Sequence, residues 1–206
     1  MLYIAITIII QRMNTDLSRL MKLMQTERFK VTQFLRGTKH QNCNNSKTQE
    51  WELTCQVNDL IMNHGLNLRA VLSCDENITG IRYNTLLDLQ HGDIFIYETK
   101  EGQVVGSPLM YIDVKVAFVS AYCFTFATIT RRSFDNFANR EKHYYWCFNM
   151  DGSKSILIDS VKFYNTVNIN DPWNNSLKPG CENNRNEDWI MGTWIHGYRK
   201  FFEVNI

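Results

Sequence analysis

The chain of 206 residues lacks several features that would point at once to a common protein class. Its formal net charge is only +1, so no overall field draws it to nucleic acid, and any such contact must come from a local patch. No glycine-rich phosphate-binding loop of the P-loop type is present, which argues against nucleotide hydrolysis. The six cysteines form no Cys-x-x-Cys pair and have no histidine beside them at a ligand spacing, which argues against a zinc site.

The start of the sequence also lacks a membrane-spanning or secretion segment. The apolar run at residues 1–10 is too short to cross a bilayer, and it has neither the basic segment nor the small-residue cleavage site of a signal peptide. It fits a buried strand or a non-essential extension before Met13, and we favour the extension. We therefore expect no membrane association and no secretion, and a reducing location in the cytoplasm, or in the nucleus of a eukaryotic cell.

The chain contains enough apolar material for a core, with 44% hydrophobic and 13% aromatic residues. Its length fits one domain with an appended segment. We expect residues 1–46 to form an N-terminal extension with a packing helix, and residues 47–206 to form the main domain. That domain would include an asparagine-rich loop at 167–188 and an aromatic, basic tail. We favour a tail that closes the core or pairs as a terminal strand; the alternative is that its aromatic and basic residues stack on bases and pair with phosphates.

Apolar spacing predicts the order of the elements. Helices are expected over 16–35, 49–63 and about 134–140, with a polar loop at 37–47; the buried side of the second helix would carry Trp51, Val57, Leu60 and Ile61. Strands are expected over 67–74, from 93, over 109–116, over 143–150 and over 155–165, with a hairpin at Asp151-Gly152 between the last two. This order favours an α/β fold with a mixed central β-sheet flanked by helices.

Charged residues stand out in one predicted strand pair. Asp93 heads an apolar strand, and Asp113 and Lys115 alternate with apolar residues in the following strand. A turn around Gly102 would fold the second strand onto the first and bring Asp93 close to Asp113. Strand alternation places Asp113 and Lys115 on one face. Since Pro108 cannot donate to the ladder, we expect the second strand to begin at Leu109.

This cluster has a chemical interpretation. Two carboxylates at a sheet edge suit Mg²⁺ or Mn²⁺, hard cations that keep several waters and share their coordination sphere with phosphate. Lys115 would orient a water or offset developing negative charge. The alternative is that Asp113 and Lys115 form a solvated surface pair that contributes little to stability.

At these residues the sequence resembles the PD-(D/E)XK nuclease superfamily. The family pattern is an acid at a strand start, a hairpin, and then Asp or Glu, any residue and Lys on the next strand. Asp93, Asp113 and Lys115 match it, Gly92 stands where the family has its proline, and Asp88 is a rival for the first acid. The resemblance covers about residues 47–159. It implies a restriction-endonuclease-like core and Mg²⁺-dependent hydrolysis of DNA phosphodiester bonds, with an endonuclease favoured.

The resemblance also implies further site residues. The family places an acid on the helix before the first core strand, where Glu50 is favoured over Glu52 as an outer-shell oxygen. The alternative is that either residue only supplies a favourable charge in the first helical turn. Arg131 and Arg132 precede a helix start that can cradle phosphate, and together with Asn136 they are candidate substrate contacts. Cutting two strands in a pair would need a homodimer.

Two other functions fit the same residues. A nuclease fold that has lost catalysis could serve as a nucleic-acid-binding or assembly protein. In an unrelated α/β interaction protein the acid-x-Lys triplet would be a coincidence, and Asp93 and Asp113 would lie far apart.

Overall fold

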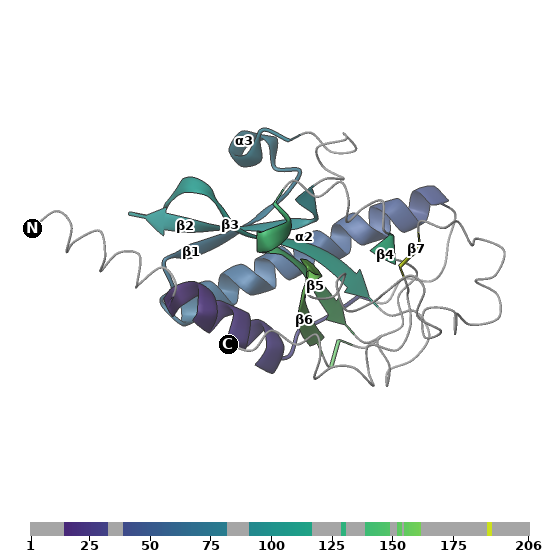
Figure 1. Ribbon diagram of the computed structural model, residues 1–206, viewed down its shortest axis with the longest axis horizontal. Coiled ribbons are helices and arrows are strands. Elements are labelled where there is room, and N and C mark those ends of the chain that lie inside the picture. Colours follow the sequence, from purple (N-terminus) through teal and green to yellow (C-terminus); the bar gives the residue numbers. More distant parts are fainter. Residues whose placement is uncertain are drawn as a thin grey trace, which may run out of the picture.

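The computed structural model describes residues 15–32, 39–81, 91–116, 129–130, 139–148, 152–153, 155–161 and 189–190. Five strands form one sheet in the order β1-β2-β3-β5-β6 (Figure 1). They are β1 (Leu68–Leu72), β2 (Ile94–Lys100), β3 (Gln103–Val116), β5 (His143–Phe148) and β6 (Ser155–Asp159). Within this sheet β3 and β5 run parallel and the other neighbours antiparallel.

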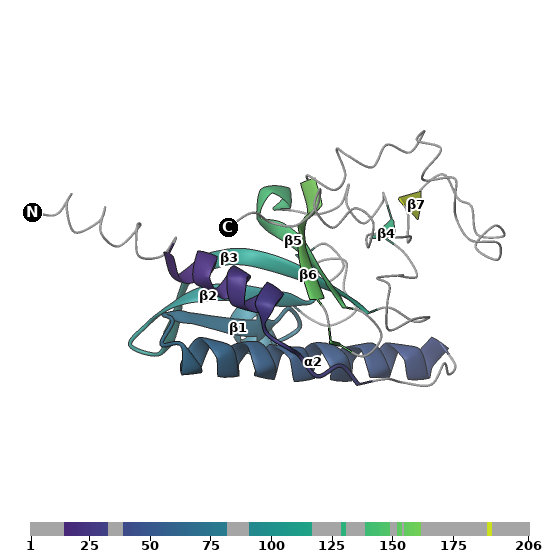
Figure 2. The ribbon, with the colours of Figure 1, turned by 90° about the horizontal axis from the view of Figure 1, so that it is seen from below.

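Helices lie on both faces of this sheet. The helix at 15–26 and α2 (Lys39–Asn63) cover one face, and Figure 2 shows α2 running along the strands. On the other face Ile78 of α3 (Glu76–Thr79) packs beside Phe95, Tyr97 and Tyr111. The predicted mixed central sheet flanked by helices is therefore confirmed. A short 3₁₀ helix, η1 (Arg140–Lys142), leads into β5, and β4 (Ile129–Thr130) pairs antiparallel with β7 (Trp189–Ile190) from the tail.

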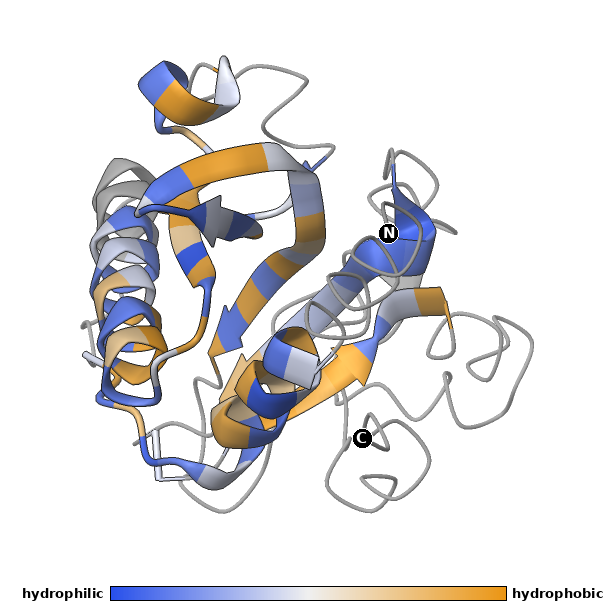
Figure 3. Ribbon diagram, turned by 90° about the vertical axis from the view of Figure 1, so that its left-hand side faces the viewer, coloured by the Kyte–Doolittle hydropathy of each residue, from blue (hydrophilic) through white to orange (hydrophobic). Residues whose placement is uncertain are grey.

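The main core follows from simple periodicity. Leu53, Val57 and Ile61 recur every four residues along α2 and are almost completely buried. At the end of β3, apolar residues alternate with Asp113 and Lys115, and Figure 3 shows hydrophobic and hydrophilic residues interleaved along a strand of the sheet. The buried strand residues on the α2 side include Ile94, Ile96, Met110, Ile112, Trp146 and Phe148.

Two helix predictions need correction. The segment from Lys39 to Lys47, expected to be a loop, is the first part of α2. A helix that buried side chains already stabilise extends at little cost, because each added residue adds one hydrogen bond. Trp51 is 57% exposed rather than buried, because it lies about 200° around the helix from Leu53, which faces the core.

The first helix is also shorter than predicted, since it ends at residue 26 rather than near Leu35. The chain leaves the helix so that Phe29 can reach the core, where its ring packs edge-on against Trp146 at a centroid distance of 4.7 Å. The Gln56 side chain holds the extended chain in place. It accepts from the Lys30 N–H at 2.7 Å and donates to the Lys30 carbonyl at 2.9 Å.

The turn between β2 and β3 lies where it was predicted, with Glu101 and Gly102 both at positive φ. The prediction that β3 begins at Leu109 is wrong, because β3 runs unbroken from Gln103. The pairs Ile96–Met110 and Glu98–Val105 enclose one residue on β2 and four on β3. Three extra residues therefore bulge from β3, and Pro108 is tolerated because it lies among them.

This bulge sets the register at the far end of the hairpin. A regular ladder counted from the pair Lys100–Gln103 would place Met110 opposite Asp93. The observed pair Ile94–Ile112 places Asp113 there instead.

The division into residues 1–46 and 47–206 stays a prediction. α2 runs across it, and Leu20 and Met24 of the first helix pack in the same core as Leu53. Among the described helices, none is both long and apolar enough to cross a membrane.

Candidate active site

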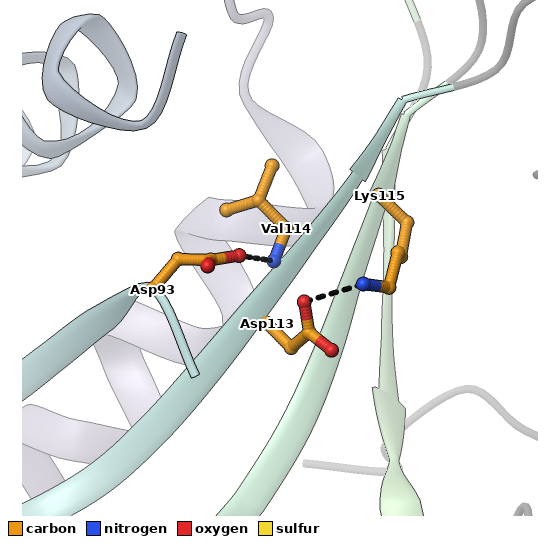
Figure 4. Close-up of polar contacts among 4 residues, drawn as sticks. All are labelled: Asp93, Asp113, Val114 and Lys115. Carbon is orange, nitrogen blue, oxygen red and sulfur yellow. Dashed lines mark hydrogen bonds and ion pairs between the residues drawn. The ribbon is translucent and has the colours of Figure 1, made fainter. Parts of the chain in front are cut away.

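Asp93 lies just before β2 and is held by three hydrogen bonds. Its N–H donates to the Ile112 carbonyl at 2.7 Å, and its own carbonyl accepts from the Ser73 N–H at 2.9 Å. Its carboxylate Oδ2 accepts from the Val114 N–H at 2.7 Å (Figure 4). The carboxylate thus continues the hydrogen-bond ladder along β3 past the first residue of β2, and this hydrogen bond fixes its position.

Gly92 has a backbone conformation that proline could not adopt. Its φ is +88°, and a Cβ there would lie 2.8 Å from the Ile112 carbonyl oxygen and 3.3 Å from His143 Nε2. Proline is restricted to φ near −65° and cannot adopt this conformation. The close approach of Gly92 to β3 is what brings the Asp93 N–H onto the Ile112 carbonyl.

Asp113 and Lys115 project from the same face of β3, and their side chains form an ion pair with Nζ and Oδ1 2.6 Å apart (Figure 4). The side chains are 14% and 25% exposed, respectively. Burial lowers the pKa of Lys115, but the carboxylates of Asp113 and Asp93 outweigh it, so the net pKa is raised. Lys115 therefore stays cationic beside both carboxylates.

Asp93 occupies a strongly unfavourable electrostatic position for a carboxylate. Burial raises its pKa well above the usual value, and the carboxylates of Glu50 and Asp113 raise it further. The Lys115 ammonium and the Val114 N–H lower the pKa of Asp93 without compensating for these effects. Two acidic side chains, Glu50 on α2 and Asp113 on β3, thus act on Asp93, which lies just before β2.

The structure separates the two helix acids. Glu50, the favoured candidate, acts on Asp93 from α2. Glu52 instead accepts a 2.6 Å hydrogen bond from the Thr32 hydroxyl, in an exposed contact with the chain after the first helix.

Strand β5 adds neighbours that the sequence did not identify as site residues. Its parallel register places Tyr145 beside Asp113 and Cys147 beside Lys115. His143 is buried, which lowers its pKa to about 4, although the Asp113 carboxylate opposes this shift. The only clue in the sequence was that His143, Tyr145 and Cys147 occupy every second position of a predicted strand and so lie on one of its faces. The pairing of β5 with β3 is non-local and could not be inferred.

An aromatic group continues this face of the sheet. His91 stacks on Tyr111 at a centroid distance of 5.7 Å, and burial lowers its pKa. The Tyr111 hydroxyl accepts a 2.9 Å hydrogen bond from Asn139 Nδ2. Other predicted site residues lie outside the described part of the chain, namely Arg131, Arg132, Asn136 and the rival acid Asp88.

The donor set fits a hard divalent cation in part. Carboxylate oxygens are the ligands that Mg²⁺ prefers, and a cation would oppose the burial and the repulsion that raise the pKa of Asp93. Asp93 Oδ1 and Asp113 Oδ2 make no hydrogen bond to the described residues. Within the described ranges, no three His, Cys, Asp or Glu side chains are placed to hold a metal ion by themselves. Two carboxylates completed by waters and phosphate match the usual coordination of Mg²⁺.

Comparison with known proteins adds little. No family model matches the chain, and no curated protein matches it. Among solved structures it is similar to D212, a nuclease from a fusselovirus, with 11% identity over 65% of this chain and 74% of that one. The TM-score of 0.38 is too low to establish a shared fold or activity.

Proposed function

We propose that the protein is a metal-dependent nuclease that hydrolyses phosphodiester bonds in DNA, acting as an endonuclease. The observation that supports this proposal is the convergence of Asp93, Asp113 and Lys115 at the open end of the β2–β3 hairpin. The repulsion between Asp93 and its acidic neighbours is further support, because it costs stability and is relieved by a bound cation.

Each residue has a distinct part in the proposed reaction. Asp93 and Asp113 would hold Mg²⁺ or Mn²⁺, which would supply a charge that polarises a phosphoryl oxygen and lowers the pKa of a bound water. Lys115 Nζ, kept cationic and anchored on Asp113, donates a hydrogen bond to the attacking water and offsets negative charge on the phosphoryl group. Glu50 contributes an outer-shell oxygen.

The DNA backbone would be held by residues beyond the central cluster. Arg131 and Arg132 bind phosphates, and Asn136 contacts the substrate from the same segment. A homodimer would be needed to cut both strands of a duplex in a concerted way.

Plasmid nicking tests the proposal. Wild type should convert supercoiled DNA to the nicked form with Mg²⁺ or Mn²⁺ and not with EDTA. Asp113→Asn should lose at least about 10²-fold in rate, the scale for removing one preorganised charge partner. Asp59→Asn is the matched control, because Asp59 is exposed on α2 and away from the cluster. Equal rates for wild type and Asp113→Asn would refute the assignment. So would the absence of cleavage by folded wild type on linear, branched and single-stranded DNA.

A second function is favoured by one observation. Lys115 is already paired with Asp113 at 2.6 Å, and no three ligands for a metal ion gather among the described residues. A nuclease fold without catalysis, serving in nucleic-acid binding or assembly, would retain such a closed pair. Calorimetry separates the two functions, since a nuclease should bind Mn²⁺ and lose that binding in Asp93→Asn, whereas an inactive scaffold should bind none.

A further inference from the structure

We propose that the hollow beside the cluster, lined by Lys47, Thr48, Trp51, Leu72 and Cys74, binds one unpaired nucleotide of the nucleic-acid substrate. The base would stack on the Trp51 indole, and its phosphate would contact the Lys47 ammonium. This inference rests on the proposed function and adds to it a substrate class, namely DNA with unpaired nucleotides next to the cleaved bond.

The hollow has a suitable size and lining. Its volume is about 370 Å³, and it is shallow and open to solvent, which suits a group that is covered on one face only. Lys47 and Trp51 are four residues apart on α2 and so lie on the same side of the helix. Leu72 closes the hollow from the end of β1. An apolar wall, an indole and a lysine together form a site for a planar group that carries a negative charge.

Trp51 differs from a scattered surface apolar residue. Two large hydrophobic side chains are exposed in the described part of the chain, Trp51 at 57% and Met62 at 72%. Single exposed apolar residues are common and need no explanation. Met62, near the C-terminal end of α2, does not line this hollow, whereas Trp51 does. An exposed indole beside a hollow and a cation fits stacking with a base.

The position of the hollow links it to the candidate active site. Leu72 pairs with Ile94, and Ser73, which lies between the lining residues Leu72 and Cys74, donates its N–H to the Asp93 carbonyl. On α2, Trp51 directly follows Glu50, which acts on Asp93. The hollow therefore lies close to the Asp93 end of the cluster, and a nucleotide in it would lie near a phosphate held at Asp93.

Unpaired nucleotides are favoured over duplex DNA for two reasons. An indole can stack only on a base whose face is free, and base faces inside a duplex are covered by their neighbours. The chain also has a net charge of only +1, so long-range attraction to the phosphate backbone gives little affinity, and contacts with individual groups matter more.

Fluorescence anisotropy with labelled DNA in EDTA tests the inference without cleavage. The probes are a 20-base-pair duplex and the same duplex with a gap of three unpaired nucleotides. Wild type should bind the gapped probe at least about tenfold more tightly. Trp51→Ala should weaken binding of the gapped probe by about 5- to 100-fold, the range for loss of one stacked base, and leave duplex binding unchanged, so that the preference is largely lost. Trp51→Phe should retain most of the preference, Lys47→Gln should weaken it, and Met62→Ala should leave it unchanged.

The outcomes distinguish this inference from the proposed function. Equal binding of the two probes by wild type, no binding of either, or an unchanged preference in Trp51→Ala would overturn the nucleotide site. Plasmid nicking by the same preparation would then leave the nuclease assignment standing. A preference that depends on Trp51, in a protein that cleaves no DNA, would support the site and reject catalysis.

Discussion

Replacing Gly92 by alanine tests whether the close approach of this residue to β3 positions Asp93. The added Cβ would lie 2.8 Å from the Ile112 carbonyl oxygen, which is the acceptor for the Asp93 N–H. Since that oxygen belongs to the backbone of a central strand, it cannot swing aside as a flexible side chain would. The strand end must shift, and the Asp93 carboxylate must then move away from the Val114 N–H.

The size of the effect can be worked out from two contributions. An alanine at φ +88° carries a strain of about 1–2 kcal/mol. Forcing a methyl group into an occupied space adds about 1–3 kcal/mol. We therefore expect Gly92→Ala to lower the free energy of unfolding by about 2–5 kcal/mol.

Gly102→Ala is the matched control. Gly102 has a similar φ of +78°, but nothing lies within 4 Å of its hypothetical Cβ. It should therefore lose only the strain of about 1–2 kcal/mol. The difference between the two variants isolates the contact with Ile112.

Urea unfolding followed by tryptophan fluorescence measures both variants, since buried Trp146 reports on the core. If the protein is a nuclease, Gly92→Ala should also cut about 10²-fold more slowly because Asp93 is displaced, whereas Gly102→Ala should retain activity. A loss of stability in Gly92→Ala no greater than in Gly102→Ala would refute the reasoning.

Three further predictions concern charges and hydrogen bonds. Folding raises the pKa of Asp93 above its usual 3.8, so the ionised carboxylate disfavours the folded state. The Asp93→Asn variant should therefore gain stability relative to wild type as the pH rises above 3.8. Mg²⁺ should raise the melting temperature of wild type only. An equal Mg²⁺ effect on both proteins would contradict this. The pKa of His143 is lowered from 6.5 to about 4. The stability of wild type should therefore fall relative to that of His143→Gln as the pH is lowered from 6.5 to about 4. Parallel plots of stability against pH, from urea titrations of the two proteins, would argue against it. The Asn58 side chain bonds both the N–H and the carbonyl of Ala70, at 2.9 and 2.8 Å, and Asn58→Ala should cost about 1–3 kcal/mol in urea unfolding. Asp59→Ala, exposed on the same helix, should cost far less.

Local patterns in the sequence were sufficient for several features. Alternating apolar residues predicted the hairpin of Asp93 and Asp113. The ability of glycine to adopt positive φ predicted the turn at Gly102. These features depend on periods of two or four residues and on the backbone freedom of glycine, which act over a few neighbouring residues. For the same reason the core-facing stripe of α2 was correct at Val57 and Ile61, both of which are buried.

Long-range packing decided the rest. The first helix ends early because Phe29 packs on Trp146, more than a hundred residues away. The parallel register that brings Tyr145 beside Asp113 depends on a crossover that no local pattern encodes. The exposure of Trp51 depends on which side of α2 meets the sheet.

The cluster itself shows both levels. Residue types and spacing identified Asp93, Asp113 and Lys115 as a group, because strand alternation fixes the face of each side chain. Their alignment depends on three extra residues that bulge from β3 and move the partner of Asp93 from Met110 to Asp113. Because three is an odd number, the unshifted register would turn Asp113 and Lys115 onto the face of Ile94. The apolar pattern favours the shifted register but did not locate the extra residues. Burial of Ile94 and Ile112 in one core selects the shifted register, because only that register pairs these two side chains on the α2 side of the sheet.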